Sequence, residues 1–519
     1  MIITGIERDP EIAEMKARLL GSFLLFIQTF FKIRTGRDFA LSHPQSRESH
    51  HITICRELTK VFHGKTNRLL INVPPGHYKS TILQHFVAWS WSHYPDAQFL
   101  YLSYSHDEAS KNTAVIKSII NLPEYRQFFG ITIDQSSSAK DDFKTVQGGT
   151  IKAFGSGGAV TGKDAGFPDC ERFSGALIMD DMHKPDEVHS DTIRQGVVKN
   201  YEETIAQRLR GPNVPQIFLG QVLHEDDLSQ YFKRGKDGYT WEKVVLKGLD
   251  EAGNALDENV KTKAELLTMK EIRPYVFASQ YQQDPLPAGG AIFKEKSFVK
   301  LDEEPKILLT FITCDTAETD KTYNDPSVFS FWGVYKLQDY GNHDLDQYAL
   351  HWLDCREDWI EPKDLRTEFL DFYGTCCHYK IPPKFAAIEK KSTGVTLLSV
   401  LEEVRGLEVR GIERTKASGS KTTRYLEIQE YVNKKLISLP AYAKHSDKVI
   451  EHCKKITAND THAHDDIADT MYDAAKIVFI DKLILNQLNK PQTDVVMKDM
   501  LQSFNRVNKL RANAAQNRM

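Results

Sequence analysis

The chain has 519 residues, of which 41% are hydrophobic and 27% charged, and this length exceeds that of a single hydrophobic core. The formal net charge of -4 excludes a uniformly basic nucleic-acid-binding protein, so any such binding must come from local basic patches. The sequence has neither a run of about 20 apolar residues that could span a membrane nor a basic segment leading into an apolar signal core. Seven cysteines without a C-x-x-C pair favour reduced thiols in a cytoplasm.

The first part of the chain has the pattern of a helical segment followed by an α/β domain. Residues 12–31 follow helical spacing, and we expect residues 1–45 to form a helical N-terminal lead-in. From Arg68 onward, short apolar runs alternate with helical segments, which predicts a parallel sheet flanked by helices over residues 46–285. One long helix is predicted near residues 189–209.

A second alternation of apolar runs and helical segments follows a stretch rich in proline and glycine. We expect a linker at residues 286–300 and a second α/β domain, with a mixed sheet and helices, at residues 301–483. Its last helix is predicted from about His464 to Ile480. Residues 484–519 are polar and carry more basic than acidic side chains, which predicts a basic, flexible tail.

Two loops combine glycine with lysine, and their surroundings decide between them. The loop at residues 157–164, GGAVTGKD, is closer to the bare phosphate-loop pattern than PPGHYKST at residues 74–81. Only the latter lies between an apolar strand and a helix, whose N-terminal amides can bind phosphate. We therefore predict a P-loop for ATP, with Lys79 on the phosphates and Ser80 or Thr81 supplying a hydroxyl to Mg²⁺. The predicted nucleotide contacts are Pro75, Gly76, His77, Tyr78, Lys79, Ser80 and Thr81.

Paired acids follow a second apolar strand about 100 residues later, as in P-loop ATPases. Asp180 is the predicted magnesium ligand, and Asp181 is the predicted catalytic group that polarises the attacking water. Gln221, just after another apolar strand, is a candidate γ-phosphate sensor, although a plain turn residue is an equal alternative. Arg208 and Arg210 are candidates for an arginine finger, and a solvated helix end is the alternative for each.

The second half of the chain places carboxylates at three separate points. Asp315 and Glu389 each end an apolar strand, and a third group, Asp465, Asp466 and Asp469, begins the last helix. This order of strand, strand and helix is typical of RNase H-like nucleases, in which such acids hold two divalent ions. Oxygen ligands favour Mg²⁺ or Mn²⁺. We predict Asp315, Glu389 and Asp465 as catalytic metal ligands, with Asp466 or Asp469 as an alternate or supporting ligand.

Histidine and basic residues surround these acids. His462 and His464 leave a transition-metal site as an alternative, but a role in tuning the neighbouring acids is favoured. Basic side chains near the acids are expected to contact DNA phosphates. They are Lys390, Lys391, Arg414, Lys416, Lys421 and Arg424.

Taken together, motifs over most of residues 45–480 resemble those of the large subunit of tailed-bacteriophage terminases. They include PPGHYKST, LIMDDMHKPDE, GQVLHEDDL, FASQYQQDPLPAGGAIF, AAIEKK and HDDIAD. The resemblance implies ATP-driven translocation of double-stranded DNA through a portal into a procapsid, with endonuclease cuts, in the host cytoplasm. It also implies a small terminase subunit as a partner and a homo-oligomeric ring on the portal.

The chain departs from the family pattern at three positions and leaves two other functions open. Gly76 replaces a usual arginine, Tyr78 a usual glycine, and Asp181 a frequent glutamate. A helicase-nuclease of DNA repair or restriction is the chief alternative, but it needs two tandem ATPase cores and residues 46–285 suffice for one. The second alternative is an inactive prophage remnant that binds DNA or the portal. The presence of all the side chains that catalysis requires disfavours it.

Overall fold

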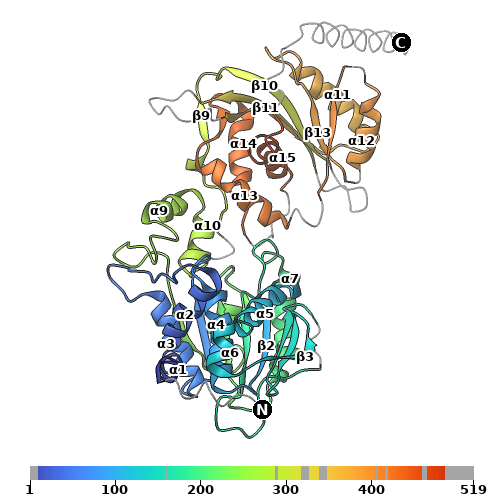
Figure 1. The fold of residues 1–519 in the computed structure, drawn as a ribbon. Helices are drawn as coiled ribbons and strands as arrows, with labels where there is room; N and C mark the ends of the chain where they lie inside the picture. Colours follow the sequence, from blue (N-terminus) through green and yellow to red (C-terminus); the bar gives the residue numbers. More distant parts are fainter. Residues whose placement is uncertain are drawn as a thin grey trace, which may run out of the picture. The chain divides into compact units, whose positions relative to one another are not determined.

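The computed structural model describes residues 10–484 except 159, 161, 287–289, 317–325, 338–347, 392, 405, 415–418 and 459–464. The chain divides into two compact units, Met1–Ala288 and Gly289–Met519. Each unit contains a sheet with helices packed on it, which confirms the predicted α/β fold class (Figure 1). Among the described residues, no helix combines the length and the apolar character needed to cross a membrane.

The first unit is built on an eight-stranded sheet. Its strands are β1 Arg68–Asn72, β2 Gln98–Ser103, β3 Ile133–Ser138, β4 Asp142–Thr145, β5 Thr150–Gly155, β6 Gly175–Asp180, β7 Gln216–Gly220 and β8 Glu242–Val245. They lie in the order β3-β4-β5-β2-β6-β7-β1-β8. The six strands from β5 to β8 pair in parallel, as predicted, whereas β3 and β4 form an antiparallel edge.

Helices cover both faces of this sheet. The helices of this unit are α1 Pro10–Gly21, α2 Phe23–Thr35, α3 His50–Phe62, α4 Lys79–His93, α5 His106–Ile120, α6 Pro123–Phe129, α7 Asp191–Asn200, α8 Leu228–Lys233, α9 Lys263–Ile272 and α10 Pro274–Val276. Of these, α9 packs in a separate apolar cluster with Leu249 and Phe277. Because side chains alternate along a strand, Ile71 and Ile178 pack against α2–α5, and their neighbours Leu70 and Leu177 pack against α7 and α8. The two faces bury separate apolar clusters, which fix the strand ends at the sheet's carboxyl edge.

The helix predicted near residues 189–209 is correct in position but not continuous. After α7, the chain forms a π-helical turn at Tyr201–Ile205 and a 3₁₀ turn at Ala206–Arg208. Tyr201 is buried and its hydroxyl donates to Gln216 on β7 over 2.9 Å. Tertiary packing of this side chain thus accompanies the change of helical pitch, which local spacing alone does not reveal.

The second unit is built on a seven-stranded mixed sheet. Its strands are β9 Val299–Leu301, β10 Ile307–Asp315, β11 Ser327–Lys336, β12 Tyr348–Asp358, β13 Ala386–Glu389, β14 Val409–Ile412 and β15 Ile437–Pro440. Their order is β14-β13-β10-β11-β12-β15-β9, and β10 is antiparallel to β11 but parallel to β13. The expected linker at 286–300 contributes to this unit, since Ile292 and Phe293 are buried and β9 joins the sheet.

Two groups of helices cover opposite faces of the second sheet (Figure 1). The helices are α11 Leu365–Cys376, α12 Thr393–Glu402, α13 Lys421–Asn433, α14 Lys444–Cys453 and α15 Asp466–Ala475. Ile312 and Cys314 of β10 pack with α11 and α12, so the alternate residues Thr313 and Asp315 face α15. The last helix begins at the predicted position and continues as a π-helical turn, Lys476–Ile480.

Candidate functional sites

Three loops of the first unit meet at one edge of the sheet. Strands β1, β7 and β6 are parallel neighbours, and Asn72 lies opposite Gly220 just as Asp180 lies opposite Leu219. The segments that follow these strand ends carry Lys79, Asp181 and Gln221. In open α/β sheets this carboxyl edge is where ligands bind.

Lys79 and Asp181 form the centre of this site. The Lys79 side chain is 6% exposed, and its Nζ lies 3.0 Å from Asp181 Oδ2. The other carboxylate oxygen, Oδ1, accepts the backbone N–H of Gln221 over 3.1 Å. Asp181 itself has φ 47, a left-handed conformation that costs a non-glycine residue energy. The carboxylate is therefore held from two sides against a strained backbone.

Asp180 is more deeply buried than its neighbour. Its Oδ2 accepts the Tyr101 hydroxyl over 2.7 Å, and burial followed by the charge of Asp181 raises its pKa to about 7. The Ser80 hydroxyl also hydrogen-bonds this carboxyl group, which opposes the rise. Among the described residues, its buried Oδ1 has no hydrogen-bond partner. An unsatisfied carboxylate oxygen beside a serine hydroxyl fits a hard divalent cation.

The loop before α4 is shaped by two residues in the left-handed region. Gly76 has φ 81, and a Cβ there would lie 3.2 Å from Val260. Tyr78 has φ 59 without being glycine, and its ring packs 5.4 Å from that of Phe39. Aromatic packing thus compensates for the glycine that the family pattern has at this position. His77 is buried and donates from Nδ1 to the Pro75 carbonyl over 2.9 Å.

The second glycine-lysine loop has a different environment. Lys163 Nζ lies 2.6 Å from Asp142, and Asp164 pairs with Arg210 over 2.9 Å. No helix follows it among the residues described up to 190. Arg208 also lies 3.8 Å from Asp164, so both arginine-finger candidates contact an acid of their own chain. Residues 159 and 161 of the loop lie outside the described residues.

The segment after β7 is fixed by a glutamine from the end of the first unit. Gln283 Oε1 accepts the Val222 N–H over 2.9 Å, one residue beyond Gln221. Gln283 is buried and has φ 55. The Gln221 side-chain carbonyl, in contrast, is buried with no hydrogen-bond partner among the described residues. Gln283 therefore positions the backbone of the predicted sensor loop.

In the second unit, the parallel pairing of β10 and β13 brings Asp315 and Glu389 to the same edge. Cys314 lies opposite Ile388, so the two acids end adjacent strands and face the same side of the sheet. Both carboxylates are buried. The two acids lie about 70 residues apart in the sequence, and their order along the chain predicted that they meet.

Helix α15 is anchored on the same face by Thr470. The Thr313 hydroxyl donates to the Thr470 carbonyl over 3.0 Å, and Ser330 Oγ lies 2.8 Å from Thr470 Oγ1. Trp332 Nε1 donates to the Thr313 hydroxyl over 2.8 Å. These buried contacts fix the helix so that Asp469, next to Thr470, lies over the strand ends.

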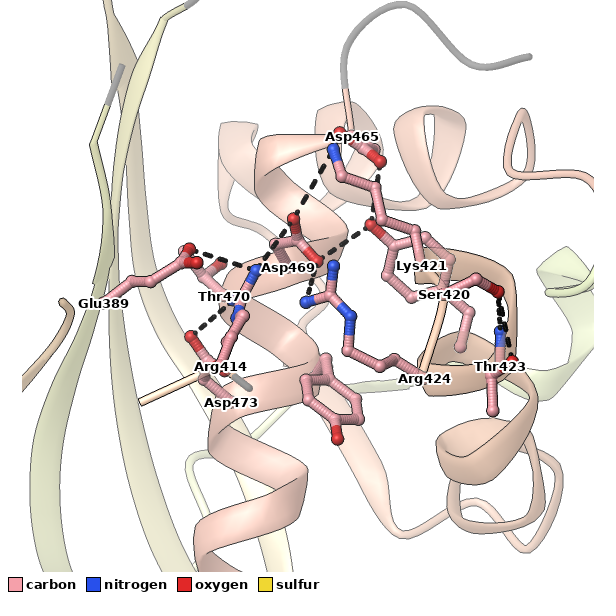
Figure 2. Close-up of polar contacts among 12 residues, drawn as sticks. Glu389, Arg414, Ser420, Lys421, Thr423, Arg424, Asp465, Asp469, Thr470 and Asp473 are labelled. Carbon is pink, nitrogen blue, oxygen red and sulfur yellow. Dashed lines mark hydrogen bonds and ion pairs between the residues drawn. The ribbon is translucent and has the colours of Figure 1, made fainter. Parts of the chain in front are cut away.

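Arg414 lies among the acids that the three elements bring together (Figure 2). Its guanidinium nitrogens lie 3.0 Å from Glu389, 3.2 Å from Asp469 and 2.9 Å from Asp473. Asp469 also pairs with Arg424 over 3.0 Å. Both arginines were predicted to contact DNA phosphates, and in this structure they contact carboxylates.

Asp465 lies at the N-cap of α15, one turn from Asp469. Lys421 lies 2.5 Å from Asp465 and 3.8 Å from Asp469, and the Tyr425 hydroxyl contacts both acids. The two acids share a helix face, as their spacing predicted. Asp466 is half-buried and its charge acts on Asp315. Lys390 pairs with Glu413 over 2.9 Å. His462, His464 and Lys416 lie outside the described residues.

The acids of this cluster differ in their proton affinity. Burial and then the charge of Asp469 raise the pKa of Asp315 well above its ordinary value. Burial also acts on Asp469, but Arg414 and the other cations outweigh it and lower its pKa. Burial raises the pKa of Asp473 to about 7. A site that concentrates this much negative charge fits added divalent cations.

Several of these residues have no role that the sequence predicted. Asp473 follows Asp469 by four residues, so helical spacing could have added it to the cluster. Tyr101, Thr470 and Tyr425 carry no sequence signal, because each acts through a partner about 40 to 160 positions away.

Only one group of three metal-ligand side chains among the described residues brings its ligand atoms within 4.8 Å of one another: His50, His51 and Asp257. It belongs to the first unit and was not predicted. The acids of the second unit are spread around Arg414 instead.

No family model and no curated protein matches the chain. Among solved structures it is similar to the large terminase of a thermophilic bacteriophage, with 11% identity, a TM-score of 0.44 and coverage of 82% of this chain and 99% of that chain. The same phage protein in complex with ATP-gamma-S gives 12% identity, a TM-score of 0.45 and coverage of 81% and 98%. The HK97 bacteriophage large terminase gives 9% identity, a TM-score of 0.35 and coverage of 84% of this chain and 92% of that chain. These three solved structures are of phage large terminases, and at such low identities the chain's function is inferred from its own side chains.

Proposed function

We propose that the chain is a viral DNA-packaging motor that hydrolyses ATP and cuts double-stranded DNA with a separate metal-dependent nuclease site. The observation that carries the proposal is the presence of two charged clusters on two sheets. Lys79 with Asp180 and Asp181 belongs to the first unit, and Asp315 with Glu389 and the α15 acids belongs to the second.

In the motor site, ATP phosphates compete with Asp181 for Lys79. The amides at the start of α4 and the Lys79 ammonium group bind the phosphates, which releases Asp181 Oδ2 to orient and polarise the attacking water. Ser80 and the unpaired Oδ1 of Asp180 would hold Mg²⁺. When bound, Mg²⁺ neutralises charge on the phosphates. Gln221, whose N–H already contacts Asp181, is placed to respond to the γ-phosphate.

In the nuclease site, Asp315, Glu389 and Asp469 would hold Mg²⁺ or Mn²⁺, which activates water and stabilises the leaving oxygen when bound. We favour Asp469 over the predicted Asp465 for two reasons. Arg414 contacts both Asp469 and Glu389, and the charge of Asp469 acts strongly on Asp315. Arg414 then leaves the carboxylates and is available, with Lys421, for DNA phosphates.

The packaging role rests on the motif resemblance seen in the sequence. It assigns residues 46–285 to the motor and 301–483 to the nuclease, after a lead-in at 1–45. The partners are double-stranded DNA, the portal of a procapsid and a small terminase subunit, with a ring of copies on the portal, in the host cytoplasm. The basic segment 484–519 is a candidate for docking to these partners, and it lies outside the described residues except for Ile484.

Two variants test the separation of the sites. Lys79→Ala is expected to abolish ATP hydrolysis and ATP-dependent packaging into matching procapsids while Mg²⁺-dependent plasmid cleavage persists. Asp315→Ala is expected to abolish cleavage and retain ATP hydrolysis. Lys111→Ala, on an exposed helix surface, is the matched control. ATP-dependent strand separation without packaging would favour a helicase-nuclease, and absence of both activities would favour an inactive remnant.

A further inference from the structure

Four titratable side chains cluster behind the phosphate loop, and the motor mechanism uses none of them. This histidine–aspartate cluster consists of His50, His51, His77 and Asp257, which are 0%, 0%, 2% and 5% exposed. One ligand atom from each of His50, His51 and Asp257 lies within 4.8 Å of the others. The His77 ring centroid lies 5.2 Å from that of His50.

The cluster contains buried nitrogen atoms that lack partners. Among the described residues, Nε2 of His50 and Nε2 of His51 accept or donate no hydrogen bond. A buried polar atom left in this state costs about 1–3 kcal/mol. Two such atoms side by side, next to a carboxylate, indicate a bound group that satisfies them.

Hydrogen bonds to Nδ1 fix the rings of His77 and His50 in the way that is usual for histidine ligands of a metal. The Pro75 carbonyl can only accept, so His77 carries its proton on Nδ1 and leaves a lone pair on Nε2. His50 Nδ1 lies 2.8 Å from Ser42 Oγ, which can accept its proton in the same way. A ligand histidine that donates its other N–H to a carbonyl or hydroxyl is the usual arrangement around a metal.

His51 requires a proton shift. Its Nδ1 accepts the Ser42 N–H over 3.2 Å and lies 3.4 Å from Ser49 Oγ, so the proton of this imidazole is on Nε2. Binding of a metal at Nε2 moves the proton to Nδ1, where Ser49 Oγ can accept it, and the Ser42 amide then gives up its acceptor. Burial lowers the pKa of His50 to about 2 and that of His51 to about 4, so both imidazoles are neutral at pH 7, as ligands must be.

We propose that the histidine–aspartate cluster binds one structural Zn²⁺ ion, each of its four side chains supplying one ligand. Three imidazoles and one carboxylate suit Zn²⁺ far better than Mg²⁺, which prefers oxygen ligands. Ligand atoms about 2.0 Å from a tetrahedral ion lie about 3.3 Å apart, so the cluster contracts on binding.

The site would join three segments that shape the phosphate loop. His50 and His51 begin α3, His77 belongs to the loop, and Asp257 lies in the turn whose Val260 packs beside Gly76. Zinc would thereby fix the loop two residues before Lys79. The inference goes beyond the proposed function, because zinc binding does not depend on ATP hydrolysis or DNA cleavage.

The test is the zinc content of the purified full-length chain after zinc reconstitution and dialysis against a weak chelator. It is carried out in the Asp315→Ala background, because nuclease carboxylates can also take up zinc. About one zinc per chain is expected. His50→Ala and Asp257→Asn are expected to reduce this at least tenfold, whereas His43→Ala, an exposed neighbour, retains it.

A second measurement needs no variant of the cluster, so it holds even where a substitution prevents folding. Replacement of zinc by Co²⁺ is expected to give visible absorption of a nitrogen-ligated ion, and chelation is expected to lower the thermal midpoint reversibly. Less than about 0.1 zinc per chain, or zinc content that survives His50→Ala in folded protein, overturns the proposal. Waters would then satisfy the orphaned nitrogens.

Discussion

The two charged sites hold their carboxylates in different ways. In the first unit, Asp181 lies on a loop with a left-handed backbone and is held by one lysine and one amide. In the second unit, Asp315 and Glu389 end rigid strands, and Asp469 lies on a helix anchored to the sheet through Thr470. The proposed motor site therefore depends on loop conformation, whereas the proposed nuclease site depends on helix–sheet packing.

This difference suits two kinds of chemistry. A loop held by an ion pair can change its conformation when ATP phosphates replace Asp181 at Lys79. A motor that cycles between conformations needs such a change. A set of acids on strands and a helix keeps fixed ligand positions, which two-metal catalysis needs. The substitutions that follow separate these two modes, because each removes a group that only one of them requires.

The largest effect is expected from Asp469→Asn. Loss of a metal-ligand charge removes several kcal/mol from the transition state, so Mg²⁺-dependent cleavage should fall about 10³-fold. Asp465→Asn is the matched comparison on the same helix face and should cost about tenfold. The measurement is the initial rate of plasmid cleavage at several Mg²⁺ concentrations. A larger loss in the Asp465 variant would restore the assignment made from the sequence.

Asp181→Asn should slow ATP hydrolysis about 10²-fold, the lower end of the range for removal of a group that handles the proton of the attacking water. An amide still accepts the Gln221 N–H but no longer pairs with Lys79. ATP binding should therefore be retained or strengthened, since Lys79 is free for phosphate. The checks are steady-state hydrolysis and equilibrium binding of ATP. Unchanged turnover would exclude Asp181 as the group that polarises the attacking water.

The same contrast explains what the sequence could predict. Lys79 and Asp180 could be proposed from the sequence because Lys79 begins the helix after an apolar strand and Asp180 ends another apolar strand, and both element types can be read locally. The acids of the second unit were proposed from their order, but local patterns could not give the proposed preference for Asp469 over Asp465. That ranking depends on Arg414, which reaches the acids from a loop about 55 residues away. The buried histidine pair at residues 50–51 gives no local signal of a cluster, because Asp257 is distant in the chain.

A smaller effect is expected at the loop after strand β7, which is hydrogen-bonded to Gln283 near the end of the first unit. Gln283→Ala leaves the Val222 amide unpaired, a cost of about 1–3 kcal/mol, so turnover of ATP should fall about tenfold with little change in KM. Gln282→Ala is the control, because Gln282 binds Leu249 and not this loop. Equal losses in both variants would mean a general loss of stability. A loss confined to Gln283 would show that the motor site depends on loop position.

The smallest effect is expected from Thr470→Val, which keeps the side-chain shape but removes the hydroxyl that contacts Ser330. The backbone carbonyl of residue 470 still accepts from Thr313, so α15 should stay on the sheet. We expect a loss of about 1 kcal/mol in the free energy of unfolding. Because Asp469 then gains freedom, cleavage should fall about threefold while ATP hydrolysis is unchanged. Thr470→Ser should restore both stability and cleavage, since serine returns the hydroxyl that contacts Ser330 and donates to the Ile467 carbonyl. A cleavage rate that is unchanged in Thr470→Val would mean that the strands alone position the nuclease acids.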